Sequence, residues 1–326
     1  MKRRSFITLL GGAAARPIAT RAQQPALPVI GFLSANIQSV SDNLVAAFGK
    51  GLADSGYVEG RNVAVEYRGV EGKYDRLPAL AGELVRRPVA VIAVPHTTPG
   101  ALAAKAATTS IPIVFGTGGD PVRLGLVSSL NRPGGNVTGV TRLSADLTAK
   151  RLELLHELVP AAAILGMVVN PDNPSAQTQT RQAQEGANRL GVRLIVTTAS
   201  SENDLDRAFM TFAQQQVAAL LVGNDVFFTS RREKLASLAA HHTIPAMYSY
   251  PEYVIAGGLI SYSASNLDSV REVGAYTARI LKGEQPGDLP VIQSAKFQLV
   301  INLKTAKALG LEIPAKLLAL ADQVIE

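Results

Sequence analysis

Short apolar runs of strand length alternate with amphipathic segments of helical length along most of the chain. Residues 29–33 predict a strand, and the segment that follows predicts a helix because Leu44, Phe48 and Leu52 recur at spacings of four. Residues 164–169 restart the alternation with another predicted strand. Strands that alternate with helices indicate parallel sheets covered by helices, so the pattern predicts an α/β fold.

One sequence pattern occurs twice. In the first copy, the strand 89–94 leads through a polar loop and an alanine-rich helix to an Ile-Pro pair and the strand 113–115. The second copy repeats this order between the strands 217–222 and 246–248. Two copies predict two Rossmann-like lobes with polar loops at the carboxyl ends of their strands, where open α/β sheets bind ligands. We therefore expect the functional site in the cleft between the two lobes.

The order of the elements predicts a hinge in which the chain crosses between the lobes about three times. A helix over 145–158, with Ser144 as its expected N-cap, precedes the first strand of the second lobe. Because both lobes are then complete, the later helix of about 267–281 is expected to return to the first lobe, and a strand at 297–303 and a helical tail follow. The predicted lobes are 28–142 with about 266–290, and 143–265 with about 291–326.

The first 22 residues have the composition of an export signal. They begin with Lys2, Arg3 and Arg4, continue with a modest apolar stretch, and end in small residues that suit cleavage after Ala22. The start resembles a twin-arginine signal, and the general Sec route is the alternative. Loss of this segment, which carries five basic residues and no acid, lowers the formal charge from +6 to +1. We expect an exported, periplasmic protein.

The charge and composition after residue 22 limit the partners. A nearly neutral chain gives no reason to expect nucleic acid or an anionic membrane as a partner, and no later apolar run is long enough to span a bilayer. The chain has no Cys and only four scattered His, which excludes disulfides and thiolate metal sites and disfavours a histidine metal centre. We expect no metal, no cofactor and a monomer.

Common signatures of catalysis and nucleotide binding are missing from the sequence. It contains no G-x-S-x-G, no Walker loop and no H-E-x-x-H. Gly116 and Gly118 begin like a dinucleotide-binding loop, but Pro121 takes the place of the third glycine. We do not expect an enzyme. A secreted hydrolase-like α/β enzyme that uses His96 in the same cleft stays the alternative.

Six sequence stretches, spread over nearly all of the chain after residue 22, carry a family resemblance. They are FGTGGDPVRLGLVSSLNRPGGNVTGV (115–140), AKRLELLHELVP (149–160), VVNPDNP (168–174), FFTSRRE (227–233), AGGLISY (256–262) and FQLVINLKTAKALGL (297–311). Together they resemble the TrpX-like family of ABC transporter substrate-binding proteins. The resemblance implies a type I periplasmic binding fold whose lobes close on a small polar ligand, such as an amino acid. It also implies an ABC permease and its ATPase as partners, and a ligand sensor for a signalling partner is a further alternative.

An amino acid needs hydrogen-bond donors for its carboxylate and an acceptor, ideally an acid, for its ammonium group. Donors are expected where a loop meets a helix N-terminus, and His96, Thr97 and Thr98 lie at such a place after the strand 89–94. Thr97 and Thr98 suit an ordinary N-cap equally well. A lone histidine such as His96 is more often a structural hydrogen-bonding group than a catalyst.

The glycine-rich turn after the strand 113–115 contributes three further candidates, Gly118, Gly119 and Asp120, and its alternative reading is a tight turn. Ser34 follows the first strand, and Ser144 lies at the first lobe crossing. Both serines are candidates because they occupy the loop edge that faces the predicted cleft.

Five candidates come from the second lobe. Asp225 follows a strand and is expected either to accept the ligand ammonium across the cleft or to cap the next helix. Phe227 is a candidate pocket wall, with core packing as its alternative. Asn170 and Asn173 are turn formers or ligand contacts. Of the tyrosines near the second Ile-Pro strand, we select Tyr248 as the candidate that lines the cleft.

Overall fold

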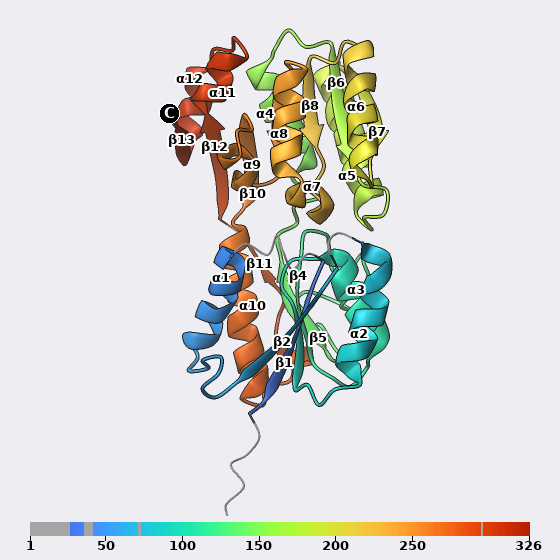
Figure 1. Cartoon of the computed structure of the whole chain (residues 1–326), viewed down its shortest axis with the longest axis vertical. Helices are drawn as coiled ribbons and strands as arrows, with labels where there is room; N and C mark the ends of the chain where they lie inside the picture. Colours follow the sequence, from blue (N-terminus) through green and yellow to red (C-terminus); the bar gives the residue numbers. More distant parts are fainter. Residues whose placement is uncertain (1–26, 36–41, 71–72, 295) are drawn as a thin grey trace, which may run out of the picture.

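The computed structural model describes residues 27–35, 42–70, 73–294 and 296–326, which fold as two lobes arranged end to end (Figure 1). The expected export signal lies outside the described residues. Each lobe is a mainly parallel sheet with helices on both faces, as the alternation of strands and helices predicts. The α/β prediction with two lobes is therefore confirmed.

The first lobe contains a six-stranded, fully parallel sheet in the order β11-β5-β4-β3-β1-β2. Its strands are β1 (Val29–Ser34), β2 (Ala64–Gly69), β3 (Val91–Val94), β4 (Ile113–Thr117), β5 (Val137–Thr141) and β11 (Ile292–Gln293). Strand β11 belongs to this sheet, so the last lobe crossing follows Gln293 and lies slightly beyond the predicted boundary at about 290.

The helices of the first lobe bury both faces of its sheet. They are α1 (Asp42–Ala53), η1 (Tyr74–Arg76), α2 (Leu77–Val85), α3 (Thr98–Ala107), α10 (Asn266–Leu281) and η2 (Pro286–Asp288). Ile30 and Phe32 of β1 pack in the core cluster with α1 and α10, whereas Leu33 packs in the cluster with α2 and α3. Neighbouring side chains of a strand point to opposite faces, so one strand supplies both cores.

The second lobe contains a seven-stranded sheet in the order β13-β12-β10-β9-β8-β6-β7. Its strands are β6 (Ile164–Val169), β7 (Arg193–Thr198), β8 (Ala219–Val222), β9 (Ala246–Tyr248), β10 (Ile260–Ala264), β12 (Phe297–Asn302) and β13 (Gln323–Ile325). Only the pairing of β10 with β12 is antiparallel among these strands. Strand β13 pairs with β12, so the chain ends in a strand, whereas the sequence pattern predicts only a helical tail.

Helices again cover both faces of the second sheet. They are α4 (Thr148–Leu158), α5 (Ala176–Leu190), α6 (Glu202–Gln214), α7 (Val226–Ser230), α8 (Arg232–His241), α9 (Pro251–Ile255), α11 (Leu303–Ala308) and α12 (Ala315–Leu320). Helix α6 begins with a capping box in which Ser201 and Asp204 bond each other's backbone N–H, and it buries Phe209 and Phe212.

The first lobe crossing differs from the prediction. Helix α4 begins at Thr148 rather than at residue 145, and its N-cap is Leu147, so Ser144 is not the cap. The residues before the helix form a turn instead, with Leu143 in the left-handed region (φ 45°) and the Thr148 hydroxyl donating to the Ala145 carbonyl. The helix starts later than predicted because residues 144–147 form this turn, in which the Ala145 N–H donates to the Gly118 carbonyl at 3.0 Å.

A buried arginine ties two parts of the hinge together. Arg151 of α4 donates from Nη1 to the Ser144 carbonyl at 2.9 Å, within the first crossing. Its Nε donates to the Tyr262 carbonyl of β10 at 2.7 Å, just before the second crossing at Ser265. These bonds fix the spacing of two chain crossings, and the predicted multi-crossover hinge is part of the observed fold.

Candidate functional site

A cavity of about 630 Å³ lies between the lobes, at the carboxyl ends of strands from both sheets. Its walls combine the loop edges that the repeated pattern predicts. The first lobe contributes Asn43, Leu44, Tyr74, His96, Thr98, Pro99, Gly118, Arg142, Ser265, Asn266, Leu267 and Asp268. The second lobe contributes Asn173, Asn224, Asp225, Val226, Thr229, Arg232, Tyr250, Pro251, Glu252, Ile255, Gln298 and Gln323.

The first-lobe wall contains the N-terminus of α3. Thr97 caps this helix by accepting a hydrogen bond from the Gly100 N–H at 3.3 Å, and it does not line the cavity. Thr98 does line the cavity, and its hydroxyl lies 2.6 Å from that of Thr117 at the end of β4. The positive end of a ten-residue helix therefore meets the cavity.

The glycine-rich turn is a point of close approach between the lobes. A Cβ on Gly118 would lie 2.5 Å from Nδ2 of Asn224, and a Cβ on Gly119 would lie 2.7 Å from Oγ of Ser175. Gly118 lines the cavity, whereas Gly119 does not. Both glycines permit the contact between lobes because they have no side chain.

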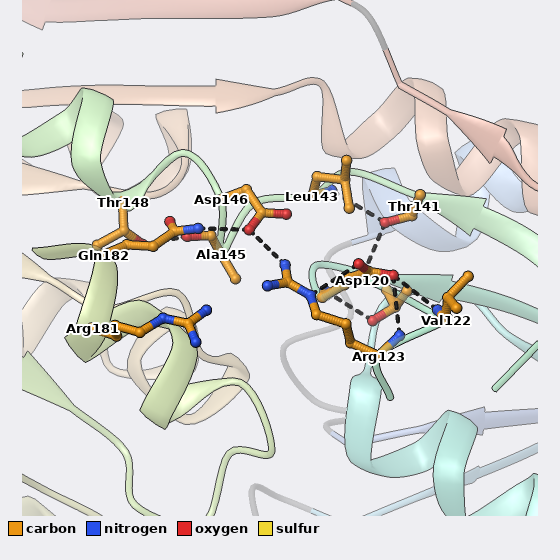
Figure 2. Close-up of polar contacts among 12 residues, drawn as sticks. Asp120, Val122, Arg123, Thr141, Leu143, Ala145, Asp146, Thr148, Arg181 and Gln182 are labelled. Atoms are coloured by element: carbon orange, nitrogen blue, oxygen red, sulfur yellow. Dashed lines mark hydrogen bonds and ion pairs between the residues drawn. The ribbon is translucent and has the colours of Figure 1, made fainter. Parts of the chain in front are cut away.

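Asp120 does not line the cavity. Its Oδ2 accepts from Nε of Arg123 at 2.9 Å, and Nη2 of the same arginine donates to Oδ1 of Asp146 at 2.8 Å. Gln182 of α5 also donates to that Asp146 oxygen, at 2.6 Å. Figure 2 shows Asp120 in this polar network, whose side chains are partly exposed and which joins the lobes.

Asp225 is buried in the second-lobe wall and accepts hydrogen bonds from several donors. It caps α7 through the Phe227 N–H at 2.8 Å, and it accepts from Nδ2 of Asn170 at 2.9 Å and of Asn173 at 2.7 Å. The Tyr74 hydroxyl, from the other lobe, lies 3.1 and 3.0 Å from the two carboxylate oxygens. Burial raises the pKa of Asp225, and these hydrogen bonds oppose the rise.

Four residues that line the cavity have a buried polar atom without a hydrogen-bond partner among the described residues. The atoms are Nδ1 of His96, Nε and Nη1 of Arg142, Oε2 of Glu252 and Oδ1 of Asn266. Burial, assisted by the positive charge of Arg142, lowers the pKa of His96 from 6.5 to about 4, so His96 is neutral at pH 7. Burial also raises the pKa of Glu252, whereas the charges of Arg232 and Arg142 lower it.

The remaining predicted residues do not line the cavity. Ser34 is buried at the end of β1, and Ser144 belongs to the hinge. The side-chain amide of Asn170 donates to Asp225, which does line the cavity. Phe227 packs in the core with the Arg231 guanidinium 5.0 Å from its ring, and Tyr248 stacks on Tyr253 with ring centroids 4.7 Å apart.

Several cavity residues were missed from the sequence. Arg142 directly follows β5, so the rule that selects Gly118 at a strand end could have found it. Tyr250 is one of the tyrosines near the second Ile-Pro strand from which Tyr248 was selected instead, and Glu252 follows it after β9, so both carry a weaker version of the same signal. Tyr74 and Asn266 had no such signal, because they reach the cavity from a 3-10 turn and from the helix after the second crossing.

Two classes of feature were not found in the described parts of the chain. No group of three or more His, Cys, Asp or Glu residues there could hold a metal ion. None of the described helices is both long and apolar enough to cross a membrane.

Two α/β lobes, a hinge of three crossings and a cavity of polar and apolar side chains between the lobes define a two-lobed ligand-binding protein. Residues 32–325 match the family model described as ABC transporter substrate binding protein. The chain therefore belongs to this family, whose members are extracytoplasmic substrate-binding components of ABC transporters and not enzymes.

Individual relatives agree with this assignment. The chain is 28% identical over 272 residues to a tyrosine-binding protein of Clostridioides difficile, covering 83% of this chain and 77% of that protein. It is 26% identical, with a TM-score of 0.83, to an ABC domain from Streptococcus pneumonia in complex with L-Trp, covering 92% of this chain and all of the other.

The relative position of the lobes can be compared with that in an open relative. A ligand-free, open substrate-binding protein from Clostridium difficile is 25% identical and gives a TM-score of 0.65, with coverage of 92% of this chain and 99% of the other. The structure is thus nearer to the L-Trp complex than to the open form at almost equal identity. In this arrangement the Tyr74 hydroxyl of the first lobe reaches Asp225 of the second, and Gly118 lies close to Asn224.

Proposed function

We propose that this protein captures a free amino acid, or a closely related zwitterion, in the cavity between its lobes and presents it to an ABC permease and ATPase. Arg142 carries the proposal. Its side chain is 2% exposed, lines the cavity, and has two nitrogens without a partner among the described residues. The charge of Arg142 already acts on the Glu252 carboxylate, but these two nitrogens form no hydrogen bond with it, and a ligand carboxylate would supply the hydrogen-bond acceptors that they lack.

The surroundings of Arg142 support a carboxylate subsite. His96 and Thr98 line the same wall, and the N-terminus of α3 adds a partial positive charge that favours an anion. The relatives are consistent with such a ligand, because one is described as tyrosine-binding and another is in complex with L-Trp. We propose an amino acid as the cargo on these two grounds.

Among the residues selected from the sequence, we propose His96, Thr98, Gly118 and Asn173 as ligand contacts because they line the cavity. Asp225 also lines it, but we assign it mainly to holding the lobes and the two asparagines in place. We do not propose Ser34, Thr97, Gly119, Asp120, Ser144, Asn170, Phe227 or Tyr248 as direct contacts.

Capture would follow from closure of the hinge. A ligand that touches His96 and Arg142 in one lobe and Asn173 in the other makes all of these contacts only when the lobes are closed. Such a ligand binds the closed state more tightly and shifts the population toward it. We further propose that the mature protein begins after Ala22, lies in the periplasm and is a monomer.

The proposal is tested by thermal unfolding of the mature chain (residues 23–326) in the presence of each standard amino acid, because a ligand that binds only the folded state raises the midpoint. We expect a concentration-dependent rise with at least one amino acid. Arg142→Gln should weaken that binding by about 2–5 kcal/mol, whereas the exposed control Arg181→Gln should not. No rise with any amino acid, or unchanged binding by Arg142→Gln, would contradict the proposal.

A further inference from the structure

Asp225 is the acid that the sequence suggests for the ligand ammonium, but its acceptor sites are already in use. A carboxylate offers about four lone-pair sites. Four donor groups use those of Asp225: the Tyr74 hydroxyl, the amides of Asn170 and Asn173, and the Phe227 N–H. A ligand cation could bind there only by displacing one of these donors, and one of them, the Tyr74 hydroxyl, joins the two lobes.

Glu252 lies in the same cavity and is bonded differently. Its Oε2 is buried and has no hydrogen-bond partner among the described residues. The charges of Arg232 and Arg142 both act on Glu252, but neither arginine forms a salt bridge or hydrogen bond with it among the described residues, and Arg232 pairs with Glu233 at 2.8 Å. The carboxylate of Glu252 therefore lacks a hydrogen-bond donor, and a buried acceptor without a donor is costly in free energy.

Asn266 supplies a second acceptor on the opposite lobe. It is the first residue of α10, which belongs to the first lobe, and its Oδ1 is also buried without a partner among the described residues. Glu252 belongs to α9 of the second lobe. An ammonium group has three donors and no acceptor, so it matches one charged and one neutral oxygen.

We propose that Glu252 and Asn266 form the subsite for the ammonium group of the ligand, an inference that rests on the proposed amino-acid binding. The carboxylate lies at Arg142, and the amine bridges the two lobes at the Glu252 subsite. The protein therefore selects zwitterions over acids that lack the amine. Asp225 is a positioning residue that organises the wall and takes no direct part in this selection.

The test measures the affinity of the mature protein for the amino acid that gives the largest rise in unfolding midpoint and for its deaminated analogue; for L-tyrosine and L-tryptophan these analogues are 3-(4-hydroxyphenyl)propionate and 3-(indol-3-yl)propionate. Wild type should prefer at least one amino acid over its analogue by about 30-fold or more. Glu252→Gln should reduce that preference to about threefold or less, with little change in affinity for the analogue. Asn266→Ala provides a second variant and should reduce the preference in the same direction.

Two further variants make the result specific. Asp225→Asn should weaken the amino acid and its analogue by the same factor and so leave the preference unchanged. Glu185→Gln, on an exposed part of α5, should change neither affinity. The inference is overturned if wild type shows no preference, if Glu252→Gln weakens both ligands equally, or if Asp225→Asn abolishes the preference. A wild type that binds amino acids and their analogues alike contradicts only the ammonium subsite, whereas no midpoint shift with any amino acid contradicts the proposed function itself.

Discussion

Asp225 and Glu252 are two carboxylates in the wall of one cavity, and burial raises the pKa of both. Asp225 is surrounded by four donor groups of the protein. Glu252 has an oxygen with no partner among the described residues. Burial and a shifted pKa therefore do not distinguish a carboxylate that organises the fold from one that awaits a ligand. The hydrogen bonds already made to each oxygen do distinguish them.

Removal of the Asp225 carboxylate should have the largest effect on stability. Asp225→Ala leaves the amides of Asn170 and Asn173 and the Tyr74 hydroxyl without their acceptor, and it removes the cap of α7. We expect a loss of about 3 kcal/mol in the free energy of unfolding, measured by urea denaturation without ligand. A loss below about 1 kcal/mol would show that Asp225 does not organise this wall.

His96 should make stability depend on pH. Its pKa is about 4 in the folded protein and 6.5 ordinarily, so the unfolded chain binds the proton more readily. The contribution of neutral His96 to the free energy of unfolding is complete above pH 6.5. As the pH falls from 6.5 to about 4, the free energy of unfolding decreases by up to about 3 kcal/mol.

The His96 contribution can be isolated by comparison with His96→Gln, because Asp225 and Glu252 titrate in both proteins. Their raised pKa values act in the opposite direction, since protonation of a buried acid becomes favourable at low pH. The stability of wild type minus that of the variant should therefore decrease as the pH is lowered from 6.5 to 4. A difference that stays constant would contradict a buried, neutral His96.

Glu252→Gln should have the opposite sign to Asp225→Ala in the ligand-free protein. The substitution keeps the shape of the side chain and removes a buried charge, for which the cost of burial outweighs the attraction of Arg232 and Arg142. We expect the free energy of unfolding to stay the same or to rise by up to about 1 kcal/mol. A loss above about 2 kcal/mol in urea denaturation would mean that Glu252 is structural, like Asp225.

Tyr74→Phe should have a small effect and should act on closure of the lobes. It removes the hydroxyl that reaches Asp225 from the other lobe, and it keeps the ring. We expect the closed state to lose about 1 kcal/mol, seen as a larger radius of gyration in ligand-free solution scattering. An unchanged scattering curve, with unchanged ligand affinity, would show that this bond does not contribute to closure.

The fold followed from periodicity to a large extent. Alternation of strands and helices predicted both lobes. The errors fall where the chain leaves a lobe or ends. Residues 145–147 form a turn before α4. The tail ends in β13 because it pairs with β12 at the edge of the second sheet, and this pairing is not visible in the local pattern of the tail.

The site was predicted only in part. The strand-end rule placed His96, Thr98 and Gly118 in the cavity wall, because the carboxyl ends of parallel strands share one edge. The same rule could not rank Asp225 against Glu252, since the donors that fill Asp225 include Tyr74, which lies 151 positions earlier in the chain. Such a partner is set by the closure of two lobes and has no local signature.

The most direct test of the account is a crystal structure of the mature protein with the amino acid that gives the largest rise in unfolding midpoint. We predict that the ligand lies in the cavity between the lobes, with its carboxylate within hydrogen-bond distance of Arg142 and its amine within hydrogen-bond distance of Glu252. A ligand outside this cavity, or one whose carboxylate lies away from Arg142, would contradict the account.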